Sequence, residues 1–189
     1  MVVRIDPLMT VDDLDCMPED GNRYEVMEGE LFVSRAPGLP HQVVSGNMFG
    51  AIWTYLEANP VGQVIATPGL VFSEYSGVIP DIVFFTHQRG TEIISGVRLI
   101  SAPDIVIEIL SPGTENVARD RIAKRQLYAR HNVNEYWILD SENWAVEIYR
   151  LNAGRLDLAV TLKDEDEITS PLLPGFGCTV SQVFRQYSA

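Results

Sequence analysis

Hydrophobic and polar positions follow two different periods along the chain, and each change of period separates a strand from a helix. Apolar side chains recur at helical spacing in residues 41–59, which predicts one long helix. A second helical pattern covers residues 114–131, with Thr114 as the expected N-cap and Asn132 at the C-terminal cap. A short helix is expected at residues 11–16, where the spacing of polar residues resembles a capping box.

Strand-like runs of apolar and β-branched residues occupy much of the remaining chain. The first two runs, within residues 24–34, flank Glu28-Gly29 and predict a hairpin, because glycine adopts the positive φ that a tight turn needs. Further strands are expected at residues 63–67, 69–73, 78–85, 104–110, 135–140, 145–151 and 155–162. The segment 86–102 is long for a structureless connection, so a short helix or a functional loop is expected there.

This order of elements predicts one α/β domain over residues 1–189. We expect a central mixed β-sheet flanked by helices, with an N-terminal hairpin and a C-terminal strand meander. A chain of 189 residues can bury a full core without disulfide bonds. Cys16 and Cys178 are therefore expected to be buried thiols, although a disulfide between them stays open.

Composition narrows the class of protein. Hydrophobic residues make up 46% and charged residues 21%, which is ordinary for a soluble globular protein. No apolar run is long enough to span a bilayer or to form a signal peptide, so we expect a cytoplasmic protein without membrane contact. The formal charge of −12 argues against a general nucleic-acid binder. Five of the fourteen cations nevertheless fall within residues 119–130.

Glu108 is an acidic residue inside an apolar run that is otherwise suited to a buried strand. It lies in APDIVIEILSP, residues 102–112. An ionised carboxylate taken out of water without a partner is very costly, so this group must be neutralised, paired or bound to a metal. In a purely structural ion pair, the partner would be Arg98 or an arginine of residues 119–130.

Asp81 is a second acid beside an apolar run, in VIPDIVFF, residues 78–85. Taken alone, it is better explained as a turn residue at a strand entrance. Side chains alternate along a strand, so Asp81 shares a face with Val83, and Glu108 shares a face with Val106. If the strands are neighbours, one register sets the two acids opposite each other, where they would share either a proton or a cation. Their hard oxygens suit Mg²⁺ or Mn²⁺.

Lys124 is the third candidate, one of only two lysines in the chain. It lies on the predicted helix that follows the Glu108 strand, and a helix returning across the sheet can point it toward the strand ends. An ammonium group there can hold a water or a phosphate oxygen. Two acids for a metal and one ammonium group suit phosphodiester hydrolysis, because the metal activates water and offsets the developing charge.

The order and spacing of these motifs resemble a known group of nucleases. Pro80-Asp81 followed by Glu108 on the next core strand resembles the PD-(D/E)XK nuclease superfamily. The usual lysine lies two residues after the acid, and that position is Leu110 here. Over about residues 10–176 the chain resembles the Uma-two family, described as "putative restriction endonucleases", through RYEVMEGEL, His41, PDIVFF, APDIVIEILSPGT, RDRIAKRQLYARHNVNEYWILD and VEIYRL.

The resemblance implies a restriction-endonuclease-like fold and a set of site residues. Asp81 and Glu108 are then expected to ligate Mg²⁺ or Mn²⁺, together with the backbone carbonyl of Ile109. In this family the lysine is thought to have moved to the helix, so Lys124 is expected to orient or deprotonate the attacking water. Auxiliary positions of the family pattern, with less clear roles, are Glu25, His41, Ser111 and Asp120.

Two functional hypotheses follow. The first is a Mg²⁺-dependent endonuclease that hydrolyses phosphodiester bonds in DNA, with Arg119, Arg121 and Arg125 as candidate DNA contacts. Such an enzyme could act as a homodimer, and the apolar tail around Phe176 and Phe184 is the candidate interface. The second is a non-catalytic module that keeps the nuclease scaffold to bind protein or nucleic acid.

Overall fold

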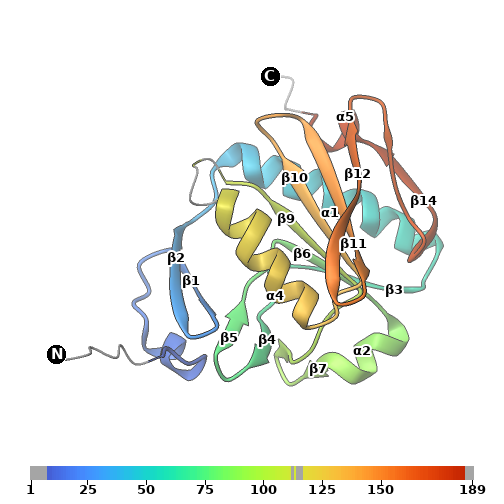
Figure 1. Ribbon diagram of the computed structural model, residues 1–189. Helices are drawn as coiled ribbons and strands as arrows, with labels where there is room; N and C mark the ends of the chain where they lie inside the picture. The colour runs from blue at the N-terminus through green and yellow to red at the C-terminus, as the bar shows by residue number, and fades with distance from the viewer. Residues whose placement is uncertain (1–7, 112, 114–116, 186–189) are drawn as a thin grey trace.

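A six-stranded mixed sheet forms the centre of the computed structural model, which describes residues 8–111, 113 and 117–185. Helix α1 (Leu39–Ala58) packs on one face of this sheet and helix α4 (Arg125–Arg130) on the other (Figure 1). The central strands, in spatial order, are β12 (Arg155–Lys163), β11 (Ala145–Asn152), β10 (Glu135–Asp140), β9 (Ile105–Ile109), β6 (Ile82–Thr86) and β3 (Gly62–Ala66). The predicted mixed sheet with flanking helices is thus confirmed.

Two further sheets, one of six strands and one of two, complete the described strands. One contains, in spatial order, β2 (Glu30–Arg35), β1 (Asn22–Met27), β5 (Ser76–Val78), β4 (Leu70–Ser73), β8 (Arg98–Leu99) and β7 (Ile94–Ser95). The other is the hairpin of β13 (Glu167–Ser170) and β14 (Leu173–Thr179). Short helical segments are η1 (Asp12–Cys16), α2 (His87–Ile93), η2 (Arg119–Lys124) and α5 (Val180–Val183).

Side chains along β9 point alternately to the two faces of the central sheet, and each face is covered by its own hydrophobic cluster. Ile105, Ile107 and Ile109 face the cluster that contains α1. Val106 faces the cluster that contains α4 and the second sheet, and Glu108 shares that face because side chains two residues apart lie on the same side of a strand. The acid is therefore enclosed between α4, β1 and the central sheet.

The chain changes sheets at Pro80, which corrects one prediction. Residues 78–85 were expected to form a single strand, but β5 ends at Val78 in the second sheet and β6 begins at Ile82 in the central sheet. Proline has no N–H to donate to a ladder, so the strand is interrupted there. Asp81 consequently lies at the junction between the two sheets.

The helix predicted over residues 114–131 is not α-helical throughout. Residues 119–124 form the π-helix η2, which runs directly into α4. Asn132 has a φ of 61°, the left-handed conformation expected after a helix C-terminus. The N-cap predicted at Thr114 lies outside the described residues.

The C-terminal region contains both a confirmed and a wrong expectation. The meander of β10, β11 and β12 is confirmed, with antiparallel pairing throughout. The tail was expected to expose Phe176 and Phe184 as a dimer interface, but both side chains are buried in the α1 cluster. Hairpin β13–β14 and α5 carry them there, so these residues are core and offer no contact surface to a second copy.

Two further expectations concern the cysteines and the membrane. Cys178 is a buried free thiol, as predicted, whereas Cys16 at the end of η1 is exposed and also free. Among the described helices, none combines the length and the hydrophobicity needed to cross a bilayer.

Replacing Phe184 by alanine tests its assignment to the core. The phenyl ring is 2% exposed, so its removal leaves a cavity, and the free energy of unfolding should fall by about 3–5 kcal/mol. Urea unfolding measures this change. Leu158→Ala, at a side chain that is 53% exposed, is the control and should change stability by less than about 0.5 kcal/mol. An equally small effect at both positions would contradict the assignment.

Candidate active site

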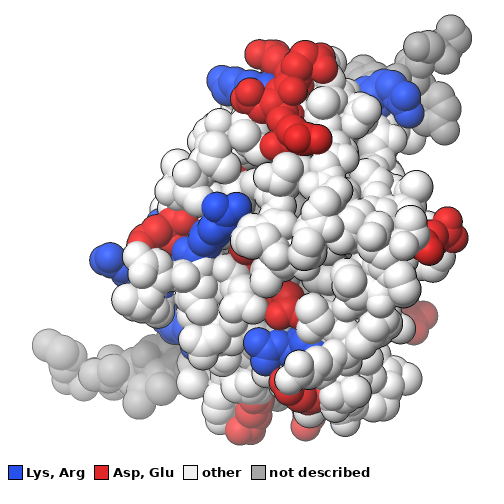
Figure 2. Space-filling model, turned by 90° about the vertical axis from the view of Figure 1, so that its right-hand side faces the viewer, with Lys and Arg blue, Asp and Glu red and all other residues white. Residues whose placement is uncertain are grey.

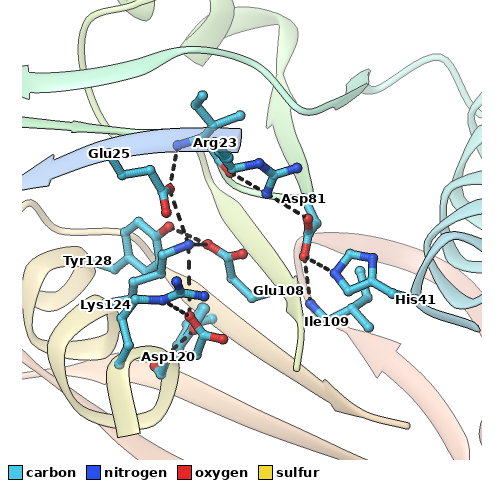
Figure 3. Close-up of polar contacts among 12 residues, drawn as sticks. Arg23, Glu25, His41, Asp81, Glu108, Ile109, Asp120, Lys124 and Tyr128 are labelled. Atoms are coloured by element: carbon cyan, nitrogen blue, oxygen red, sulfur yellow. Dashed lines mark hydrogen bonds and ion pairs between the residues drawn. The ribbon is translucent and has the colours of Figure 1, made fainter. Parts of the chain in front are cut away.

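Asp81 and Glu108 come together through the pairing of β6 with β9. The two strands are antiparallel, and Ile82 lies opposite Ile107. One further step in that register sets Asp81 opposite Glu108, as the sequence analysis anticipated. Figure 3 shows both carboxylates facing the same space, with Lys124 on the α4 side and His41 on the α1 side.

Glu108 is held by two donors from the helical segment above it. Lys124 Nζ lies 2.8 Å from Oε1, and the Tyr128 hydroxyl donates to the same oxygen at 2.7 Å. Its contacts with the described residues all use Oε1. Burial raises the pKa of Glu108 to about 8; Lys124 opposes the rise, and Asp81 adds to it.

Lys124 is enclosed by carboxylates and is only 1% exposed. Besides Glu108, its ammonium lies 3.3 Å from Glu25 Oε1 and 3.9 Å from Asp120 Oδ1. Burial acts to lower the pKa of Lys124, but the charge of Glu108, followed by those of Glu25 and Asp120, raises it above its ordinary value. Lys124 is therefore the partner that Glu108 requires, in place of the Arg98 considered from the sequence, which pairs with Asp15.

Asp81 is surrounded by donors from three different elements. His41 Nε2 lies 3.1 Å from Oδ2, which also accepts the Ile109 N–H at 2.9 Å, and Arg23 Nη1 lies 3.1 Å from Oδ1. Burial alone would raise the pKa of Asp81, but the hydrogen bond and charge of His41, with the Ile109 N–H, hold it at about 2. The donors around Asp81 thus favour its ionised form.

Strand β1 fixes the segment that carries Asp81. Glu25 Oε1 accepts the Ile79 N–H at 2.7 Å, and Arg23 Nη1 donates to the Ile79 carbonyl at 3.2 Å. Both main-chain groups of Ile79 are therefore satisfied where the chain leaves the second sheet. Because Glu25 also contacts Lys124, the same carboxylate links the junction to the helix.

The remaining auxiliary residues from the sequence lie at different distances from the acids. His41 contacts Asp81 directly, and its Nδ1 is a buried atom without a hydrogen-bond partner among the described residues. Asp120 faces Lys124 and accepts the Arg119 Nε–H at 3.0 Å. Ser111 lies two residues beyond Ile109, half-buried.

The three arginines proposed for DNA contact occupy different surroundings. Arg119 lies beside Asp120 at the edge of the acid cluster. Arg121 is already paired with Asp140 at 2.9 Å and with Glu147 at 2.7 Å. The Arg125 guanidinium lies over the Tyr149 ring, 5.1 Å from its centroid. Of the three, only Arg119 reaches the acid cluster.

Sequence reasoning missed Tyr128 and Arg23. Tyr128 follows Lys124 by four residues, a spacing that places two side chains on one face of an α-helix, so a search from Lys124 could have found it. Arg23 belongs to the RYEVMEGEL motif but precedes Glu25 by two residues, and only the strand period would have placed both on one face. Its contact with Asp81 depends on the pairing of β1 with β5, which nothing in the sequence indicated.

The donor set of the acid pair fits a hard divalent cation. Four carboxylates (Glu25, Asp81, Glu108 and Asp120) face three basic side chains (Arg23, Arg119 and Lys124) and His41. With all four carboxylates ionised, the net charge of the cluster is −1 when His41 is neutral and zero when it is protonated. In the described part of the chain, no three His, Cys, Asp or Glu side chains are arranged to hold a metal ion. Mg²⁺ usually keeps several waters and binds through one or two carboxylates, so two acids and a carbonyl are sufficient.

Comparison with known proteins places the chain in a family. A structure described as "a putative nuclease belonging to DUF820 from Anabaena variabilis ATCC 29413" is similar in fold, with a TM-score of 0.76. Its sequence is 18% identical, and the match covers 93% of this chain and 97% of that one. The type IIG restriction endonuclease BpuSI matches more weakly, with a TM-score of 0.42 and 16% identity over 76% of this chain and 15% of that chain.

Among curated proteins, no sequence matches the chain. A family profile, Uma2, described as "Putative restriction endonuclease", matches residues 11–181, nearly the whole chain. The structural similarity shows the shared fold, and the profile covers β1, the acid pair and η2. The chain belongs to the Uma2 family.

Proposed function

We propose that this protein is a metal-dependent endonuclease that hydrolyses phosphodiester bonds in DNA. The observation that carries the proposal is the register of β6 with β9, which sets Asp81, directly before β6, opposite Glu108, with Lys124 Nζ 2.8 Å from Glu108. Membership of the Uma2 family supports the same reaction class. An apolar strand has no structural need for an acid at Glu108, since a hydrophobic residue there would avoid the cost of burying charge.

In this proposal the acid pair holds Mg²⁺ or Mn²⁺. Asp81, Glu108 and the backbone carbonyl of Ile109 would hold the metal. The Ile109 N–H donates to Asp81, so the main-chain amide of this residue orients the Asp81 carboxylate. A divalent cation bound there supplies Lewis acidity and lowers the pKa of water.

Lys124 orients the attacking water in this proposal and does not deprotonate it. A general base must lose its proton near working pH, whereas the carboxylates around Lys124 raise its pKa. As a fixed ammonium it holds Glu108 Oε1 at 2.8 Å. Of the two roles that the family resemblance implied, the structure of the cluster supports the orienting one.

DNA would have to approach a protein that is acidic as a whole. On the face shown in Figure 2, basic side chains are few and dispersed, and several of them lie beside acidic side chains. The affinity for phosphate must therefore come from cations close to the acid pair or from a partner. A cytoplasmic location and cleavage of both strands by a pair of copies are further parts of this proposal.

A non-catalytic module is the second candidate. The observation that favours it is that the polar groups of the cluster already have partners among the described residues. Lys124 contacts three carboxylates, and Asp81 accepts from three donors. A buried network of this kind can serve structure alone. Metal binding and DNA cleavage distinguish the two candidates.

Supercoiled-plasmid nicking tests the proposed reaction. The wild-type protein should nick plasmid with Mn²⁺ or Mg²⁺ and lose activity with EDTA. Glu108→Gln should lower the rate by about 10³-fold or more, because it removes a metal-ligand charge. Lys124→Met should lower it by about 10²-fold through lost orientation of the water.

Glu92→Gln on α2 is the matched control, because this glutamate is exposed and lies outside the cluster. Circular dichroism and thermal unfolding establish that each variant folds. A wild-type protein that binds Mn²⁺ without nicking any plasmid would favour the non-catalytic module. Nicking that persists in folded Glu108→Gln would contradict the assignment of this site.

Metal affinity should depend on pH through Glu108. Its folded-state pKa, about 8, is above the ordinary 4.5, so its contribution to stability is present at low pH and lost as pH rises through about 8. A metal needs the ionised carboxylate and must displace the proton. The association constant for Mn²⁺ should therefore rise by up to about tenfold per pH unit between pH 6 and 8.

Isothermal titration calorimetry measures this dependence, and buffers with different ionisation enthalpies report the proton released. The slope should disappear in Glu108→Gln, together with most of the affinity. A wild-type affinity that is constant from pH 6 to 8 would contradict the role of Glu108 as a proton-linked ligand.

A further inference from the structure

The π-helix η2 changes which side chains share a face. In an α-helix, residues five apart are rotated by about 140° relative to each other, so position 119 would point away from position 124. In a π-helix the hydrogen bond joins residues i and i+5, which brings these two positions close to the same face. Arg119 and Asp120 can therefore both accompany Lys124, and Asp120 and Lys124 are buried within η2. π-Helical turns are rare in proteins, and those that occur are frequently found at functional sites.

Arg119 is anchored by one atom of its guanidinium group. Its Nε donates to Asp120 Oδ1 at 3.0 Å, which is its one contact with a carboxylate of the described residues. The two terminal amino groups are left without such a contact. The side chain is 12% exposed, compared with 1% for Lys124, so Arg119 stands between the buried cluster and solvent.

The charge on Arg119 is permanent. Burial acts to lower its pKa, but Asp120, followed by Glu25 and Glu108, raises it. The other two cations make more contacts within the cluster: Lys124 faces three carboxylates, and Arg23 Nη1 binds both Asp81 and the Ile79 carbonyl. A planar guanidinium whose terminal amino groups contact no carboxylate of the described residues matches the geometry of two phosphate oxygens.

We propose that Arg119 binds the phosphate group of the phosphodiester substrate at the acid pair, and that η2 exists in its π-helical form to place it there. The inference rests on the proposed function, because it presumes a phosphodiester at Asp81 and Glu108. Asp120 is the positioning residue: it fixes Nε and leaves the amino groups to the substrate. Lys124 and Arg119 then have different tasks, since the first neutralises the buried acids and orients the water, and the second contacts the substrate anion.

Arg119→Gln and Arg119→Lys test the proposal in the full chain, with Arg98→Gln as the matched control. Arg98 is exposed, pairs with Asp15 on η1 and lies on β8 of the second sheet. With Mn²⁺, Arg119→Gln should lower the plasmid-nicking rate by about 10²-fold, the typical effect of losing a donor to a developing oxyanion. Arg119→Lys keeps the positive charge but lacks the planar guanidinium, so its nicking rate should lie between those of Arg119→Gln and the wild-type protein.

Binding and metal loading are measured separately. A fluorescein-labelled 30-base-pair duplex with Ca²⁺ gives affinity by anisotropy, and the slope of log K against log salt should decrease by about 1 in Arg119→Gln. The thermal shift produced by Mn²⁺ should match that of the wild-type protein, because Arg119 is no metal ligand. If Arg119→Gln fails to fold, Arg119→Lys carries the same measurements, with a smaller loss expected.

The outcomes separate this inference from the proposed function. Cleavage and duplex binding in Arg119→Gln equal to those of Arg98→Gln would overturn the role of Arg119, even if the wild-type protein is an active nuclease. A wild-type protein that cleaves no DNA would overturn the proposed function. In that case, weaker duplex binding by Arg119→Gln than by Arg98→Gln would still support phosphate binding, and equal binding would overturn it.

Discussion

The burial of the Glu108 carboxylate is the constraint on which the arrangement of this protein depends. A charge in β9 cannot be buried without compensation. Lys124 and Tyr128 compensate it, because both donate hydrogen bonds to the Glu108 carboxylate. Removing one partner of such a buried pair typically costs about 3–5 kcal/mol. This requirement accounts for the position of η2 and α4 over the sheet. It also accounts for the inward direction of the Lys124 side chain.

Two departures from regular secondary structure serve the same cluster. At Pro80 the chain leaves one sheet and enters the other, and Asp81 takes the place where the β6 ladder would have continued, accepting the Ile109 N–H with its side chain. In η2, the wider turn gathers several charged side chains on one face. Each departure costs regular hydrogen bonding, and each brings a polar group to the acid pair. Locally irregular backbone at a functional site is a recurrent property of folded proteins.

The sequence was informative where a pattern is local, and uninformative where the contact depends on pairing between distant segments. The β10–β12 meander, the N-terminal hairpin and the face of Glu108 all follow from a period of two, and the long α1 from a period of 3.6. Arg23 could not be found, because its contact with Asp81 needs β1 to pair with β5 across about fifty residues of chain. The burial of Phe176 and Phe184 was missed for a similar reason: an apolar tail looks the same whether it covers the core or remains exposed, and hairpin β13–β14 decides between the two.

The central claim is that Asp81 and Glu108 share one divalent cation. Anomalous diffraction from crystals soaked in Mn²⁺ tests this most directly. The account predicts a single strong peak within coordination distance of an Asp81 oxygen and of Glu108 Oε2, with Lys124 still on Oε1. A map without a peak there, or with the metal only at surface acids, would contradict the claim and leave the cluster as a buried ion-pair network.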